Sequence, residues 1–229
     1  KSKGYNLLMS EDVLAAIDSI KKLGIKVRIQ KNYCEIVGNG INGFKYIKNL
    51  TIDAKNSGTL GRLILGLLIK SPKKIKIIGD KSLSKRDFSR VTTPLRKFGV
   101  KFFYKIKNKL PLTILGTQSA KGIKYFENKG SAQCKSSIML AALNASGTTS
   151  IKAKKSRNHT ELLFKYLKIP IKIRKTKKFD FIDIKKPKKI IAFNYQIPGD
   201  ISSSAFFMVL TTLADNSKLL VKNVNINPS

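Results

Sequence analysis

The sequence predicts an α/β fold of repeated βαβαββ units with buried helices, because two kinds of helix alternate along the chain. The first kind is amphipathic and leads through a small turn into a β-branched run. We expect these helices at residues 11–23, 88–98 and 160–167. The second kind opens on Ser, Asn or Thr and is apolar nearly all round, which indicates burial. We expect those helices at residues 56–69, 131–145 and 200–214.

The segments between the helices have the composition of strands. Gly24 and Gly99 suit helix C-caps, since glycine adopts the left-handed conformation found there. Strands are expected after the apolar helices, at 74–79, 148–153 and 218–223. Three pairs of strands are expected to form hairpins: residue 27 with 35–37, residues 101–104 with 112–115, and residues 171–174 with 181–184. The unit therefore recurs at a spacing of roughly 70 residues, about two and a half times, as small mixed sheets around buried helices.

Charge is the unusual feature of the composition. The 229 residues include 46 Lys and Arg against 13 Asp and Glu, for a formal net charge of +33. Such a charge can indicate nucleic-acid binding. The lysines are spread over every segment, however, and the aromatic residues do not cluster. We therefore expect a solvated lysine surface and no nucleic-acid partner, and we keep a basic RNA-binding module as the alternative from another class.

The remaining composition narrows the class of protein. Cys34 and Cys134 lie far apart and His159 is the sole histidine, so we expect neither a metal site nor a disulfide. No apolar run is long enough to span a bilayer and no signal peptide is visible, which favours a cytoplasmic protein with no membrane partner. Because the chain starts at Lys1 and stops just after a strand-like run, we expect it to be a piece of a longer protein.

Arginine is rare, and several of the arginines lie in polar motifs. Only seven of the 46 basic residues are arginines. A guanidinium binds carboxylate or phosphate through two parallel hydrogen bonds, which an ammonium cannot copy. Three polar motifs at predicted helix starts contain an arginine: 56–62 with Arg62, 79–86 with Arg86, and 156–161 with Arg157. A fourth, at 131–136, contains Ser131, Gln133 and Lys135. Each alone could be a simple helix cap. Since three lie at repeat-equivalent strand-to-helix junctions, we expect them to share one face and bind a small anion.

These motifs, together with 90–95 and 198–206, resemble the EPSP synthase (3-phosphoshikimate 1-carboxyvinyltransferase) family. The likeness is to the class with Ser-Ala-Gln and Arg-x-His-Thr-Glu motifs, and the motifs run in family order over nearly the whole chain. The resemblance implies one lobe of a two-lobed inside-out α/β barrel and covers about half of a complete member. It places an incomplete N-terminal lobe at residues 1–196 and the crossover and start of the C-terminal lobe at 197–229.

The resemblance also implies a reaction of the shikimate pathway, which leads to chorismate and the aromatic amino acids. The enolpyruvyl group of phosphoenolpyruvate is transferred to the 5-hydroxyl of shikimate 3-phosphate, with release of phosphate. It further implies no cofactor and a monomer when complete. The residues expected to bind phosphoenolpyruvate are Gly58, Arg86, Gln133, Asn56, Thr59 and Arg62. Those expected to bind shikimate 3-phosphate are Ser131, Ala132, Gln133 and Arg157.

The chain departs from the family pattern in several places. Asp87 stands where the family has Pro, and could weaken anion binding or cap a helix; Lys55 replaces a usual Gly. The early Lys-Ser…Arg substrate motif and the proton-transfer residues of the second lobe are missing from this sequence. Glu161 and Asp200 are expected to cap helices, so we expect no catalytic residue here and no activity from the chain alone.

A sister enzyme that acts on UDP-N-acetylglucosamine shares the fold and the donor, and is the closest alternative. Its reactive-loop cysteine is not evident here, because Cys134 falls inside a predicted buried helix.

Overall fold

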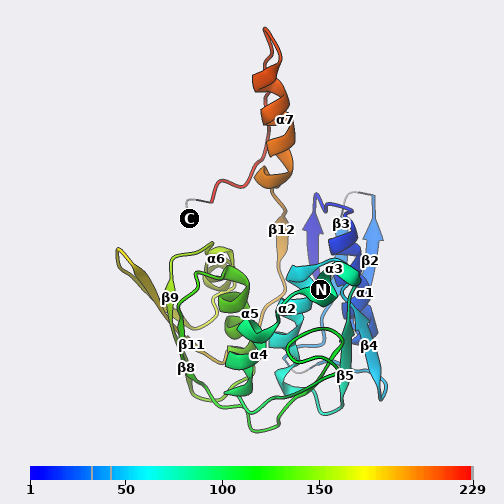
Figure 1. Cartoon of the computed structure of the whole chain (residues 1–229), viewed down its shortest axis with the longest axis vertical. Coiled ribbons are helices and arrows are strands. Elements are labelled where there is room, and N and C mark those ends of the chain that lie inside the picture. The colour runs from blue at the N-terminus through cyan, green and yellow to red at the C-terminus, as the bar shows by residue number, and fades with distance from the viewer. Residues whose placement is uncertain (32, 42, 228–229) are drawn as a thin grey trace.

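A computed structural model describes residues 1–31, 33–41 and 43–227. Its described part forms three four-stranded sheets around a set of helices (Figure 1). The strands are β1 (Ser2–Tyr5), β2 (Lys26–Gln30), β3 (Tyr33–Val37), β4 (Leu50–Asp53), β5 (Ile75–Ile78), β6 (Lys101–Tyr104), β7 (Leu112–Leu115), β8 (Lys124–Glu127), β9 (Thr148–Lys154), β10 (Ile171–Lys175), β11 (Phe179–Lys185) and β12 (Asn194–Gln196). The helices are α1 (Glu11–Lys22), α2 (Gly58–Leu67), η1 (Leu68–Lys70), α3 (Lys81–Lys85), α4 (Ser89–Arg96), α5 (Ala132–Ala142), α6 (His159–Tyr166) and α7 (Ile201–Leu213).

The three sheets share one topology, which confirms the predicted repeat and the fold class. In the second sheet β4 pairs parallel with β5, and β7 lies antiparallel between β5 and β6. The third sheet repeats this with β8, β9, β11 and β10. The first sheet has β1, β3 and β2 in the same order, and its parallel outer strand is β12, from far along the chain. The predicted hairpins are all present, as β2–β3, β6–β7 and β10–β11.

The predicted amphipathic helices are confirmed as α1, α4 and α6. Gly24 and Gly99 have φ of 84° and 95°, the left-handed conformation expected of residues that end a helix. In the third unit Lys168 takes the same conformation, with φ of 55°. A non-glycine residue pays a steric cost there, so the repeat keeps its turn geometry even where the sequence signal is absent.

The predicted burial of the apolar helices is confirmed for α2 and α5, which lie in the centre of the molecule. Ile64, Leu65, Ile138 and Met139 from these helices are almost fully buried in one continuous core. The two helices approach very closely, since a Cβ atom at Gly66 would overlap the carbonyl oxygen of Ser137. The Ser137 hydroxyl donates a hydrogen bond to the Arg62 carbonyl oxygen at 3.0 Å. Only glycine permits this approach.

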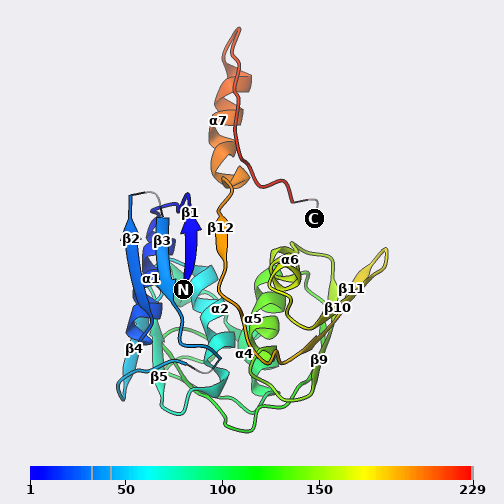
Figure 2. The ribbon, with the colours of Figure 1, turned by 180° about the vertical axis from the view of Figure 1, so that it is seen from behind.

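The prediction of a third buried helix at 200–214 is wrong for this structure. Helix α7 extends away from the three sheets (Figures 1 and 2), and Phe206 and Leu213 are 80% and 78% exposed. The strand predicted at 218–223 does not form; Val224, the next residue, makes an isolated parallel bridge with Gly199. An apolar helix is buried only where another element covers it, and in the described part of the chain only the segment that follows α7 runs along one side of it. Among all the described residues, no helix has the length and apolar character needed to cross a bilayer.

We expect Gly66→Ala to destabilise the protein by roughly 2 kcal/mol, because overpacking forces the backbones of α2 and α5 apart. Urea unfolding followed by circular dichroism measures this. Gly61→Ala in the same helix is the matched control: its Cβ would lie 3.4 Å or more from the nearest atoms, which are side-chain atoms of Phe88 and Ala54. The control should be neutral or slightly stabilising, since alanine favours helix. Equal losses in the two variants would contradict the close-packing explanation.

Candidate functional site

The predicted site motifs lie where parallel strands end. Strands β4 and β5 are parallel, as are β8 and β9, so the loops that follow each pair emerge at the same sheet edge. In the second sheet the Asp80 backbone N–H donates to the Lys55 carbonyl at 2.9 Å. In the third sheet a Cβ at Gly130 would lie 3.5 Å from the Lys155 carbonyl oxygen. The topology therefore sets the motif loops side by side in pairs.

Two arginines cover the start of α2. Ser57 caps this helix, its hydroxyl oxygen accepting from the Leu60 backbone N–H at 3.1 Å. A Cβ at Gly58 would lie 2.8 Å from Nη1 of Arg62 and 3.0 Å from Nη1 of Arg86. Both guanidiniums thus gather over the first turn of a helix, whose free N–H groups already favour an anion.

Gln133 joins the start of α5 to the start of α2. Its Oε1 accepts from Arg62 Nη1 at 2.9 Å, and its Nε2 donates to Thr59 Oγ1 at 2.9 Å. Ser131 caps α5, with its hydroxyl oxygen accepting from the Cys134 backbone N–H at 3.3 Å, and Ala132 begins the helix. The N-termini of two helices therefore meet at one place, and both present partial positive charge to it.

Electrostatics at this place favour a negative ligand. Burial lowers the pKa of the Arg62 guanidinium, and the positive charges of Arg86 and Arg90 lower it further. A group whose positive form is disfavoured by neighbouring cations gains from a bound anion. The ring of Phe88 lies under the Arg62 guanidinium at 5.3 Å. This stacking holds the planar group in place.

The Asp87 carboxylate bonds the first residue of α4, next to Phe88 at the N-cap position of that helix. It accepts hydrogen bonds from the Ser89 backbone N–H at 2.6 Å and the Ser89 hydroxyl at 2.7 Å, at the start of α4. These bonds lower the pKa of the Asp87 carboxyl, so it is ionised at neutral pH. Its charge raises the pKa of Arg62, in opposition to the nearby cations.

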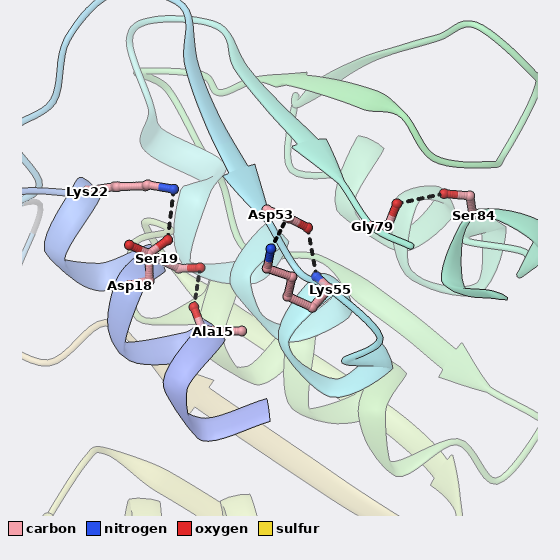
Figure 3. A network of polar contacts seen from close by, with 8 residues as sticks. All are labelled: Ala15, Asp18, Ser19, Lys22, Asp53, Lys55, Gly79 and Ser84. Carbon is pink, nitrogen blue, oxygen red and sulfur yellow. Dashed lines mark hydrogen bonds and ion pairs between the residues drawn. The ribbon is translucent and has the colours of Figure 1, made fainter. Parts of the chain in front are cut away.

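Asn56 and Lys55 shape the loop before α2. The Asn56 amide donates to the Asp80 carboxylate, which also caps α3 by accepting from the Leu83 backbone N–H at 2.6 Å. Lys55 has φ of 52°, a conformation that suits the glycine usual in the family. Asp53 holds it there, accepting from the Lys55 backbone N–H at 2.8 Å and pairing with its ammonium at 3.0 Å (Figure 3). Asn56 therefore joins two loops of the site.

The structure corrects the expectations for Lys135 and Glu161. Lys135 was expected to present its ammonium at the start of α5, and Glu161 to cap a helix. Instead the Lys135 side chain is fully buried and pairs with Glu161 Oε1 at 2.6 Å. Lys135 lies one turn inside α5, where its side chain reaches α6 rather than the helix end. Asp200 does cap its helix, accepting from the Ser202 backbone N–H at 2.9 Å.

Arg157 lines a cavity whose walls do not include the residues of the cluster over Gly58. This cavity has a volume of about 510 Å³ and is also lined by Gly199, Asp200 and Ser202. The structure thus brings Gly58, Thr59, Arg62, Arg86 and Gln133 together, with Ser131 and Ala132 at the same helix end as Gln133. No role was predicted for Phe88 or Arg90, although Arg90 begins the 90–95 motif that resembles the family. Across the described residues, no group of His, Cys, Asp and Glu side chains is arranged to hold a metal ion.

Comparison with known proteins finds one family along the whole chain. The sequence model described as EPSP synthase (3-phosphoshikimate 1-carboxyvinyltransferase) matches residues 1–229. The 3-phosphoshikimate 1-carboxyvinyltransferase of Streptococcus mutans is 39% identical over 228 residues, which are 99% of this chain and 52% of that protein. The Bacillus subtilis protein of the same name is 37% identical over 226 residues, 98% of this chain and 51% of its own.

A solved structure extends the comparison to three dimensions. EPSP synthase from Acinetobacter baumannii superposes with a TM-score of 0.86 at 33% identity, covering 99% of this chain and 51% of that one. The chain spans about half the length of the curated relatives it matches. With the family motifs in order, the repeated topology shared and the match running from end to end, this chain belongs to the EPSP synthase family.

Proposed function

We propose that the protein containing this chain transfers the enolpyruvyl group of phosphoenolpyruvate to the 5-hydroxyl of shikimate 3-phosphate. The observation that carries the proposal is the gathering of Arg62, Arg86 and Gln133 over Gly58, where two helix N-termini meet. Family membership supplies the reaction, and this geometry suits its small anionic substrates. Residues 1–196 form most of the N-terminal lobe, and 197–229 cross over and start the C-terminal lobe. The end of β12 at Gln196 and the departure of α7 from the sheets support that boundary.

The proposed roles follow from the placement of the groups. Arg86 and Arg62 hold the charged groups of phosphoenolpyruvate above Gly58, and Asn56 and Thr59 shape that side of the site. Gln133 lies between the two substrates. On the other side, shikimate 3-phosphate is held by Ser131, Ala132 and Arg157.

The chemistry requires a proton donor as well as clamps. The methylene carbon of phosphoenolpyruvate takes up a proton while its C2 gains positive character and is attacked by the 5-hydroxyl, which gives up its own proton. The resulting tetrahedral adduct then loses phosphate and one proton of its new methyl group, which restores the carbon–carbon double bond. Fixed cations at the carboxylate and phosphate stabilise this charge redistribution without reorganising. Of the acids weighed from the sequence, Glu161 is buried against Lys135 and Asp200 caps α7. The proton donor and acceptor therefore come from the second lobe, and the isolated chain is inactive.

The compartment belongs to the same proposal. Cys34 and Cys134 are both buried free thiols, which suits a reducing cytoplasm. The monomeric state of the complete protein stays a prediction.

Phosphate release by the complete protein tests the proposed reaction. Phosphoenolpyruvate is supplied with shikimate 3-phosphate in one assay and with UDP-N-acetylglucosamine in another, and the isolated chain is assayed beside it. We expect release only with shikimate 3-phosphate and only from the complete protein. Release with the nucleotide sugar alone replaces the acceptor, and turnover by the isolated chain contradicts its proposed inactivity. Silence in both assays of the complete protein favours the basic RNA-binding alternative, whose RNA affinity should fall steeply with salt.

Gly58→Ala should weaken phosphoenolpyruvate binding while leaving the fold intact. The added methyl meets the ends of two flexible arginine side chains, at 2.8 Å and 3.0 Å, so the guanidiniums move and the backbone does not. We expect the KM for phosphoenolpyruvate to rise by about tenfold or more, as for other small misplacements of binding groups. The KM for shikimate 3-phosphate should change little. Gly61→Ala, one turn along, is the control, and equal changes in both KM values would argue against this assignment.

Alkylation tests whether Cys134 could serve as a reactive cysteine. Burial raises the pKa of the Cys134 thiol to about 12, and its Sγ lies 2.9 Å from the Arg90 carbonyl oxygen. The reactive thiolate is therefore scarce at pH 8. We expect iodoacetamide to leave Cys134 unmodified in the native protein and to modify it in guanidinium chloride, as measured by peptide mass spectrometry. Modification of native Cys134 with loss of activity would revive the sister-enzyme alternative.

A further inference from the structure

A buried ion pair joins Lys135 on α5 to Glu161 on α6. Both side chains are almost fully inaccessible, at 0% and 4% exposure, and their charged atoms lie 2.6 Å apart. Taking two charges out of water costs free energy that their attraction often does no more than offset, so a buried pair is a poor source of stability. The contacts that surround the pair show what else it does.

Lys135 links the two loops on the proposed shikimate 3-phosphate side. Its backbone N–H donates to the Ser131 carbonyl at 3.0 Å, and its ammonium donates to the Ser156 carbonyl at 3.4 Å. Ser156 directly precedes Arg157. One residue therefore connects the cap of α5 to the residue next to the arginine.

Neighbouring contacts place the same two segments together independently. The hydroxyls of Ser136 and Thr160 share a hydrogen bond of 2.7 Å between α5 and α6. At the loop level, a Cβ at Gly130 would lie 3.5 Å from the Lys155 carbonyl oxygen. The Ser131 loop and the Arg157 loop are thus adjacent, and the ion pair lies at the base of both.

Glu161 in turn fixes the lysine. Its Oε1 bonds the Lys135 ammonium, whereas its Oε2 has no hydrogen-bond partner in the described part of the chain. The ammonium has three N–H donors, and its bonds to Glu161 and to Ser156 define its direction. Loss of either charged partner leaves the other charge buried alone.

We propose that Lys135 and Glu161 are positioning residues for shikimate 3-phosphate. The proposal rests on the proposed function. The pair does not touch the substrate. Its hydrogen bond to the Ser156 carbonyl holds that backbone beside the start of α5, so that Arg157 and Ser131 can bind the same anion. Phosphoenolpyruvate is held at Gly58 and Arg86, and the ion pair positions neither of these residues.

The test is the double variant Lys135→Met/Glu161→Leu in the complete protein, which replaces both charged groups with apolar side chains of similar volume. Replacing both partners of a buried pair is often neutral for stability, so the melting temperature should stay near that of the wild type. We expect the KM for shikimate 3-phosphate to rise by about tenfold, as for a binding group displaced by less than 1 Å. The KM for phosphoenolpyruvate and kcat should change by less than about twofold. Arg157→Lys provides the benchmark for losing the arginine fork itself.

Lys165→Met is the matched control, because Lys165 is an exposed lysine on the same helix as Glu161. It should leave both KM values unchanged. An unchanged shikimate 3-phosphate KM in a folded double variant overturns the positioning role, and an equal rise in both KM values shows general distortion and overturns it too. If the double variant cannot be purified, Glu161→Asp decides: the shortened carboxylate should raise the shikimate 3-phosphate KM selectively, and no such rise rejects the proposal. Absence of turnover in the wild type would instead reject the proposed function.

Discussion

The close approach of α2 and α5 at Gly66 is the constraint on which the site depends. With no side chain at Gly66, the Ser137 carbonyl comes against α2, and the Ser137 hydroxyl bonds the Arg62 carbonyl. The two helices are thereby set in register, so that Gln133 reaches both Thr59 and Arg62. If α2 and α5 were further apart, the core could still be packed, but the N-termini of the two helices would no longer be joined through Gln133. The packing of the core thus fixes the geometry of the polar groups at its edge.

The same arrangement concentrates positive charge where burial penalises it. Arg62, Arg86 and Arg90 lie near one another, and the pKa of Arg62 is lowered by burial and by the other two charges. The folded protein tolerates the repulsion among these arginines because burial of the apolar side chains of α2 and α5 contributes more free energy than the repulsion costs. A bound anion relieves it, and a ligand that binds the folded state alone stabilises that state. Binding and stability are therefore coupled at this site.

Local sequence signals predicted the repeat well, and contacts distant in sequence explain where prediction failed. Glycines after helices and the two kinds of apolar periodicity identified α1, α2, α4, α5 and α6, because each signal lies within its own segment. The sequence pattern of α7 is that of a buried helix, yet burial depends on a covering partner that periodicity cannot reveal. Lys135 was misjudged for a similar reason: its partner Glu161 belongs to another helix. The sequence predicted only that the motifs of Arg62 and Gln133 lie on one face of the protein. It could not predict their hydrogen bond, because that contact depends on the helix spacing at Gly66.

Capping and ligand binding at these helix starts are compatible for serine and not for aspartate. Ser131 accepts the Cys134 N–H with a lone pair, so its hydroxyl proton is still available to donate to a phosphate. An ionised aspartate is an acceptor only and repels an anion. In this chain Ser57 and Ser131 cap α2 and α5, the helices that carry Gly58 and Gln133, whereas Asp80 and Asp200 cap α3 and α7. The two helix starts that Gln133 joins are thus capped by residues whose hydroxyl protons remain free to donate to an anion.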